Sequence, residues 1–194
     1  DGGCAERVCV PEVNCVPVPD SLDDRGAAAV PVAFVTAWNM LVRQAHVAAD
    51  EDVLVMGAGS GVGTAAVQIA KLFGARVIAV AGTEEKLAKA RALGADEGIN
   101  STRQDLGQEI RRLTGKRGAD VVFEHVGGAA WQKLIPNLAP GGRLVTCGAS
   151  AGYEGRVDIR YLFSKSISIL GAFLGTKSDL PNIVGHLACG RLRP

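Results

Sequence analysis

A regular alternation of short apolar strands and helices, beginning at Asp52, constrains the fold more than any other feature. Strands are predicted at Val53–Met56, Val77–Val80, Ile99, Val121–Glu124, Arg143–Cys147 and Ser166–Phe173. Nearly continuous apolar strands are typical of parallel sheets that are covered on both faces. Because a helical segment lies between successive strands, the order predicts an α/β fold with a six-stranded, parallel, doubly wound sheet.

The predicted helices occupy most of the remaining chain. They cover Val62–Phe73, Glu84–Leu93, Gln104–Leu113, Ala129–Leu138 and a segment that starts near Ser178–Pro181. An Ala-rich helical region is expected from Ser21 to about His46, with an interruption at Pro31. Before it, Cys4–Val10 and Asn14–Val18 are expected to be the last extended strands of a β-rich unit.

Charge and cysteine content exclude several classes of protein. The 21 basic and 20 acidic residues give a net charge of +1, which argues against a protein that binds nucleic acid or anionic membranes in general.

The longest apolar run, Ala27–Trp38, is too short to span a bilayer, and no leader is visible at Asp1. The 5 cysteines form no metal-like cluster and are expected to be buried, reduced thiols of a cytoplasmic protein.

Four glycines lie at every second position where the first strand meets the next helix. Gly57, Gly59, Gly61 and Gly63 would let the backbone approach a phosphate and let the helix pack closely on the strand. The helix amino end would then offer free N–H groups and a positive dipole to a pyrophosphate. The spacing differs from G-x-G-x-x-G, so S-adenosylmethionine-dependent methyltransferases stay an alternative to dehydrogenases at this point.

The end of the second strand distinguishes these alternatives. Both methyltransferases and NAD-dependent dehydrogenases usually place an acidic residue there to hold ribose hydroxyls, but this chain has Ala81 followed by Gly82. Thr83 and Lys86 can instead offer a hydroxyl and an ammonium to a 2′-phosphate. The sequence therefore predicts NADPH as the cofactor in preference to NADH.

Several motifs together resemble the zinc-free, quinone oxidoreductase-like members of the medium-chain dehydrogenase/reductase superfamily, which are related to zinc-type alcohol dehydrogenases. They are Gly57–Lys71, Glu85–Leu87, Leu93–Asp96, Ala119–Gly128 and Leu138–Val145. The resemblance implies a dinucleotide-binding Rossmann domain over residues 23–194 and a remnant of an N-terminal catalytic domain over residues 1–22. It also implies that the chain is cut from a longer enzyme, with Gly190–Pro194 leading back to the catalytic domain.

The resemblance also implies roles for individual residues. Gly61 and Val62 would meet the pyrophosphate, with Gly59 and Gly63 in the same turn, and Lys86 would meet the 2′-phosphate. The residues expected near the nicotinamide are Thr36, Val126, Gly127, Cys147, Gly148, Phe173 and Leu174. The family often has Asn-Tyr after the third strand, where this chain has Asn100-Ser101, so an adenosine contact is missing there.

No catalytic acid or base is assigned from the sequence. His125 could act as a general acid, but a loop histidine without catalytic duty is favoured. Cys147 is expected to be a small residue near the cofactor, because nothing nearby in sequence would activate its thiol. Tyr153 could donate a proton, but little in its loop supports that role.

The predicted function is hydride transfer from NADPH to a small electron-poor acceptor such as a quinone or an enone. Zinc is not expected in this chain, because Val32 occupies the position of one cysteine ligand in the zinc-containing relatives. A zinc-dependent alcohol dehydrogenase, with its ligands upstream, and a nucleotide-binding module without turnover stay open as alternatives. The apolar segment Ser166–Phe173 is expected to pair two copies into a homodimer.

Overall fold

Six parallel strands form one sheet at the centre of a computed structural model that describes residues 3–194. The strands are β1 (Asp52–Val55), β2 (Arg76–Ala81), β3 (Glu97–Asn100), β4 (Ala119–Glu124), β5 (Leu138–Thr146) and β6 (Ser168–Gly171). Their order across the sheet is β3-β2-β1-β4-β5-β6. The chain therefore winds outward in one direction from β1 and in the other from β4, which confirms the predicted doubly wound fold.

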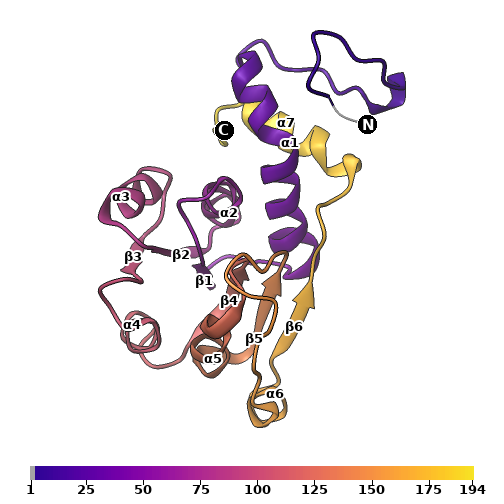
Figure 1. Ribbon diagram of the computed structural model, residues 1–194. Helices are drawn as coiled ribbons and strands as arrows, with labels where there is room; N and C mark the ends of the chain where they lie inside the picture. Colours follow the sequence, from indigo (N-terminus) through magenta and orange to yellow (C-terminus); the bar gives the residue numbers. More distant parts are fainter. Residues whose placement is uncertain (1–2) are drawn as a thin grey trace.

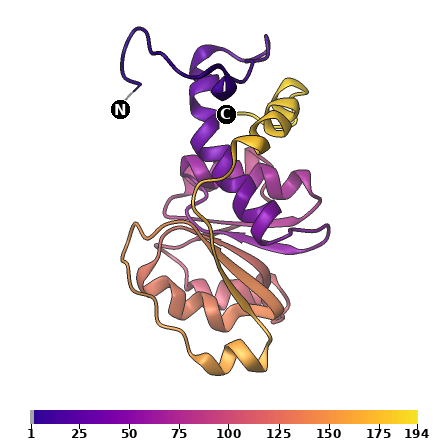
Figure 2. The ribbon, with the colours of Figure 1, turned by 90° about the vertical axis from the view of Figure 1, so that its right-hand side faces the viewer.

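Helices cover both faces of this sheet (Figures 1 and 2). They are α1 (Asp24–Trp38), α2 (Gly61–Leu72), α3 (Glu84–Ala92), α4 (Leu106–Leu113), α5 (Trp131–Leu134), α6 (Ile159–Ser164) and α7 (Leu180–Ala188). Strand β1 shows how the sequence builds both layers, because successive side chains point to opposite faces. Val53 and Val55 pack with α1, α2, α3 and α7, whereas Leu54 packs with α4 and α5 on the other face.

The structure corrects several predicted boundaries. Helix α1 continues through Pro31, because the proline lies on its exposed side, where water can satisfy the unpaired carbonyl group. A π-helical turn at Asn39–Gln44 follows this helix. Helix α6 was not predicted, although Asp158 caps it by accepting a hydrogen bond from the Arg160 N–H at 3.0 Å. The predicted helix 129–138 is shorter and is flanked by 3-10 turns, since Leu138 already belongs to β5.

The amino-terminal segment does not form the expected strands. Among residues 3–23 the structure has only a 3-10 turn, Glu12–Asn14, because no strand edge lies beside this segment to pair with it. Residues 1 and 2 of the predicted domain remnant lie outside the described part of the chain. The division into residues 1–22 and 23–194 stays a prediction.

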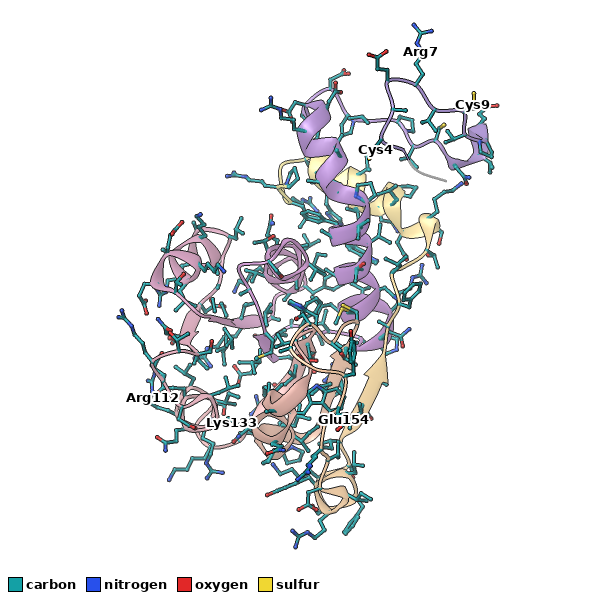
Figure 3. The ribbon with its side chains drawn as sticks, in the orientation of Figure 1. Cys4, Arg7, Cys9, Arg112, Lys133 and Glu154 are labelled. Atoms are coloured by element: carbon teal, nitrogen blue, oxygen red, sulfur yellow. The ribbon has the colours of Figure 1, made fainter. Side chains whose placement is uncertain are left out.

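The cysteines are not buried as expected. Cys4, Cys9, Cys15 and Cys189 are exposed, and Cys147 is half-buried. Figure 3 shows Cys4 and Cys9 on the amino-terminal segment, well away from the sheet. Cys4, Cys9 and Cys15 lie on a segment outside the core, which therefore cannot bury them, whereas Cys189 is exposed at the end of α7.

One helical segment, Asp24–Gln44, is long and apolar enough to cross a membrane by length and composition alone. Its side chains Val30, Phe34 and Leu41 are buried in the same core as α2 and β1. In this fold the segment is therefore a core helix. Its apolar character follows from its position against the sheet.

The turn between β1 and α2 brings two backbone segments into very close contact. A methyl group added to Gly63 would lie 2.3 Å from the Gly57 carbonyl oxygen, which no side chain can tolerate. Gly57 itself has φ +58°, a left-handed conformation that glycine adopts without strain. The Ser60 hydroxyl caps α2 by accepting a hydrogen bond from the Gly63 N–H at 3.1 Å.

We expect Gly63→Ala to lower the free energy of unfolding by at least about 2 kcal/mol, because helix and turn must separate to admit the methyl group. Gly61→Ala is the matched control, since its methyl group would contact only Ala33, at an ordinary 3.9 Å. Urea denaturation of both variants is the measurement. Equal stabilities for the two variants would contradict the close approach.

An ion pair between a buried carboxylate and a half-exposed arginine joins the start of α7 to the π-helical turn. The side chain of Asp179 is buried and accepts hydrogen bonds from Arg43 Nε at 2.8 Å and Arg43 Nη2 at 2.6 Å. The Thr176 hydroxyl donates to the same carboxylate at 2.8 Å. Burial alone would raise the pKa of Asp179, but these donors and the Arg43 charge hold the pKa below its ordinary value of 3.8.

Asp179→Asn should lower the free energy of unfolding at pH 7 by about 1–3 kcal/mol, because the half-exposed Arg43 loses its buried partner. A carboxylate whose pKa is lowered by folding stabilises the protein above its unfolded-state pKa. The difference in unfolding free energy between wild type and Asp179→Asn should therefore be largest above pH 3.8 and decrease as the pH falls below that value. Urea denaturation between pH 2.5 and 7 checks this. A deficit that does not change with pH would contradict it.

Candidate nucleotide-binding site

A cleft of about 680 Å³ opens at the carboxyl ends of β4, β5 and β6, beside the amino end of α2. This is the point where the chain reverses its winding direction between β1 and β4, the usual ligand position in such sheets. Seven of the predicted site residues line it: Thr36, Gly61, Val62, Cys147, Gly148, Phe173 and Leu174. The remaining lining residues are Ala29, Val32, Ala33, His125, Ala149 and Ser150.

The amino end of α2 forms one wall of this cleft. Helix capping by Ser60 satisfies the Gly63 N–H, whereas the N–H groups of Gly61 and Val62 have no acceptor within the helix. The helix dipole adds partial positive charge at this end. An anionic group such as a pyrophosphate is the ligand that this arrangement favours.

The end of β2 provides a second polar region, next to the glycine turn. Ala81 is buried, and the Thr83 hydroxyl caps α3 by accepting a hydrogen bond from the Lys86 N–H at 3.3 Å. The carbonyl of Gly82 accepts a hydrogen bond from the Thr102 hydroxyl at 3.0 Å. These contacts hold the backbone in place, and the position usually occupied by an acidic residue carries the small, uncharged side chain of Ala81.

Lys86 lies against the glycine turn with its ammonium available. A methyl group on Gly59 would lie 2.8 Å from the Lys86 Cγ and Cδ atoms, so the lysine stem packs on that glycine. The neighbouring acids have other partners: Glu85 pairs with Lys89 at 2.8 Å, and Glu84 accepts a hydrogen bond from Asn100 at 2.6 Å. Within residues 3–194, no carboxylate pairs with Lys86. The ammonium is therefore free to meet an added anion.

Two loops form the opposite end of the cleft. Val126 and Gly127 follow β4, and Cys147 and Gly148 follow β5. Phe173 and Leu174, just beyond β6, are 86% and 46% exposed at the cleft mouth. Thr36 reaches the same space from the buried side of α1. Of the residues predicted near the nicotinamide, five line the cleft: Thr36, Cys147, Gly148, Phe173 and Leu174. Val126 and Gly127 lie in the loop after β4 but do not line it.

His125 lies between the glycine turn and the cleft. Its Nε2 atom is 3.3 Å from the Ser60 hydroxyl, and a methyl group on Gly57 would lie 2.8 Å from its ring. The ring also contacts Phe123 edge-on. These contacts explain why a histidine fits here without a catalytic role, which stays the favoured interpretation.

The other candidate acids and nucleophiles are poorly placed or not activated. Burial raises the pKa of the Cys147 thiol, and the nearby Glu124 carboxylate raises it further, so the reactive thiolate is disfavoured. Tyr153 is 97% exposed and does not line the cleft. No three His, Cys, Asp or Glu side chains of the described chain come together as metal ligands. The prediction of no zinc in this chain is not tested by that finding.

Sequence reasoning missed Glu124, the last residue of β4. Its carboxylate is completely buried and accepts hydrogen bonds from the loop after β4, from α5 and from the last residue of β5. The available signal was an acidic residue at the end of an apolar strand, directly before a loop that contains two glycines.

Comparison with known proteins gives the family. Residues 61–188 match the family described as "Zinc-binding dehydrogenase". Quinone oxidoreductase of Pongo abelii is 33% identical over 191 residues, which cover 97% of this chain and 57% of that protein. The chain thus spans little more than half the length of this curated relative.

Solved structures support the same assignment. The structure named as an NAD-dependent alcohol dehydrogenase is 50% identical, with a TM-score of 0.91 over 95% of this chain and 54% of its own. The 2-octenoyl-CoA carboxylase reductase CinF, solved with NADP and 2-octenoyl-CoA, is 31% identical, with a TM-score of 0.81 over 91% of this chain and 44% of its own. The chain therefore belongs to the zinc-binding dehydrogenase family of the medium-chain dehydrogenase/reductase superfamily and matches its cofactor-binding part.

Proposed function

We propose that this chain is the NADPH-binding part of a cytoplasmic, zinc-free oxidoreductase. The whole enzyme would transfer hydride to a small electron-poor acceptor such as a quinone or an enone. The observation that carries the proposal is the free Lys86 ammonium beside the glycine turn, where buried Ala81 replaces an acidic residue. A positive charge there favours a cofactor with a 2′-phosphate over one with a free ribose hydroxyl.

The residues of the chain fit this cofactor at both ends of the site. Gly61 and Val62 would bind the pyrophosphate through backbone N–H groups, and Lys86 would bind the 2′-phosphate. The loops after β4, β5 and β6 would orient the nicotinamide and exclude water from it. When bound, the cofactor supplies the hydride, so the protein mainly contributes position.

The character of the cleft supports a soft acceptor. The side chains that line it are mostly apolar, so they suit an apolar acceptor. Its one thiol, Cys147, is not activated as a nucleophile, because burial disfavours the thiolate. An acceptor that is already electron-poor needs little help from a general acid. Relatives named quinone oxidoreductase, and the reductase solved with NADP and 2-octenoyl-CoA, are consistent with this class.

A second candidate is an alcohol dehydrogenase that uses NAD. The 50% identity to a structure with that name favours it. Under this alternative any zinc ligands would lie outside this chain. A third possibility is that the chain on its own is a nucleotide-binding module without turnover, since it spans 57% of its quinone oxidoreductase relative.

Titration of the chain with NADPH, NADH and S-adenosylmethionine tests the proposal. We expect NADPH to bind most tightly, and Lys86→Ala to raise its Kd about tenfold by removing the charge on the 2′-phosphate. Binding of NADH should not change. Calorimetry or nicotinamide fluorescence measures the affinities.

Lys89→Ala is the matched control, because Lys89 lies on the same helix but already pairs with Glu85. It should leave NADPH binding within about twofold of wild type. Preference for NADH would retain the dehydrogenase and refute the 2′-phosphate assignment. Preference for S-adenosylmethionine would refute the proposed function as a whole.

We also propose a homodimer formed through the segment Ser166–Phe173. Strand β6 is an edge strand that pairs only with β5. Near the amino end of this strand, Ile159 and Phe163 of α6 are mostly exposed and would be covered by a second copy (Figure 1). An apolar edge strand without charged side chains is a template for pairing with another strand.

Sedimentation of the purified chain should show a dimer, and Ser168→Lys should shift it toward monomer because charge on an edge strand opposes pairing. Ser168 is exposed, so the substitution leaves the core intact. Ser21→Lys is the matched control: it adds the same charge far in sequence from Ser166–Phe173, and it should not change the mass of the dimer measured by sedimentation. Monomer alone at high concentration would refute this assembly.

A further inference from the structure

The buried carboxylate of Glu124 holds the loop after β4 and bonds the last residue of β5, where the second loop at the nicotinamide end of the cleft begins. Its Oε1 atom accepts hydrogen bonds from the N–H groups of Val126 at 2.6 Å and Gly127 at 2.8 Å. Its Oε2 atom accepts a hydrogen bond from Trp131 Nε1 at 3.1 Å. The Thr146 hydroxyl lies 3.2 Å from Oε2 and 3.2 Å from the Gly148 carbonyl oxygen, so these two acceptors share its one proton. Four donors from the loop after β4, from α5 and from the end of β5 thus meet on one side chain.

The loops that these donors support pack directly against each other. The Ala151 N–H donates to the Val126 carbonyl at 2.7 Å, and Gly127 forms a parallel bridge with Gly152. A methyl group on Gly127, which has φ +73°, would lie 2.3 Å from the Gly152 carbonyl oxygen. Because the contact is between backbones, a shift in one loop must displace the other.

The charge of Glu124 has no obvious use in stability. Among the described residues no cation pairs with this carboxylate, which is completely buried. Burying an unpaired charge is costly, even when hydrogen bonds satisfy its oxygens. A charged acceptor that holds several N–H and O–H groups is, however, an effective way to fix a loop in one conformation.

We infer that Glu124 is a positioning residue that sets the nicotinamide end of the site and leaves the adenosine end untouched. This inference rests on the proposed function, because it assigns the cleft beside these loops to the nicotinamide. The adenosine end depends on other contacts, namely the Thr83 cap and the Lys86 stem on Gly59. The two halves of the cofactor should therefore respond differently to loss of the carboxylate charge.

Two ligands separate the halves: NADPH fills both ends, whereas 2′,5′-ADP fills only the adenosine end. Glu124→Gln keeps the side-chain length but turns an amide group toward donors, so at least one hydrogen bond is lost: the Trp131 N–H cannot bond an amide nitrogen, whereas the Thr146 hydroxyl can turn to accept from it. We expect the Kd of NADPH to rise at least about tenfold, and that of 2′,5′-ADP to stay within about twofold of wild type. Glu109→Gln, on α4 and paired with Arg112, is the matched control and should change neither value.

The outcomes are distinct. Equal weakening of both ligands by Glu124→Gln would show a merely structural role and overturn the inference, as would no weakening of either. A wild-type chain that binds neither ligand would refute the proposed function, and the inference would fall with it. If Glu124→Gln does not fold, the same two titrations are made with Thr146→Val, which removes the hydroxyl that donates to Glu124. It should weaken NADPH about three- to tenfold and spare 2′,5′-ADP, and equal effects on the two ligands would overturn the inference.

Discussion

The close approach of α2 to the end of β1 is the constraint on which the rest of the structure depends. Only glycine fits at position 63, because a methyl group there would lie 2.3 Å from the Gly57 carbonyl oxygen. This contact places the uncapped N–H groups of Gly61 and Val62 at the carboxyl edge of the sheet, where the winding direction reverses. The fold thereby places positive partial charge in the cleft without using a charged side chain.

Polar side chains then fix the two ends of the site separately. At one end Thr83 caps α3, while Glu84 and Glu85 are engaged by Asn100 and Lys89, which leaves the Lys86 ammonium free. At the other end a single buried carboxylate, that of Glu124, holds the loop after β4, whose backbone contacts the loop after β5. The proposed division of the cofactor into a phosphate-bearing half and a reacting half follows this division of contacts.

The sequence was sufficient for the sheet, its winding and the glycine turn, because these depend on local patterns: apolar strands, helix caps such as Thr83, and glycine spacing. It was insufficient where the outcome depends on distant partners. The amino-terminal segment was expected to form strands but has no edge to pair with, and α1 continues through Pro31 because that face is exposed. Glu124 was missed because its burial depends on the packed sheet and because one donor, Thr146, lies 22 positions away, whereas its nearer donors are backbone N–H groups and a tryptophan without a distinctive sequence pattern.

A crystal structure of the chain with bound NADPH would show how the site holds the two halves of the cofactor. We expect the pyrophosphate at the N–H groups of Gly61 and Val62, the 2′-phosphate at the Lys86 ammonium, and the nicotinamide beside the loop that Glu124 holds. A cofactor bound elsewhere, or with its 2′-phosphate turned away from Lys86, would contradict it.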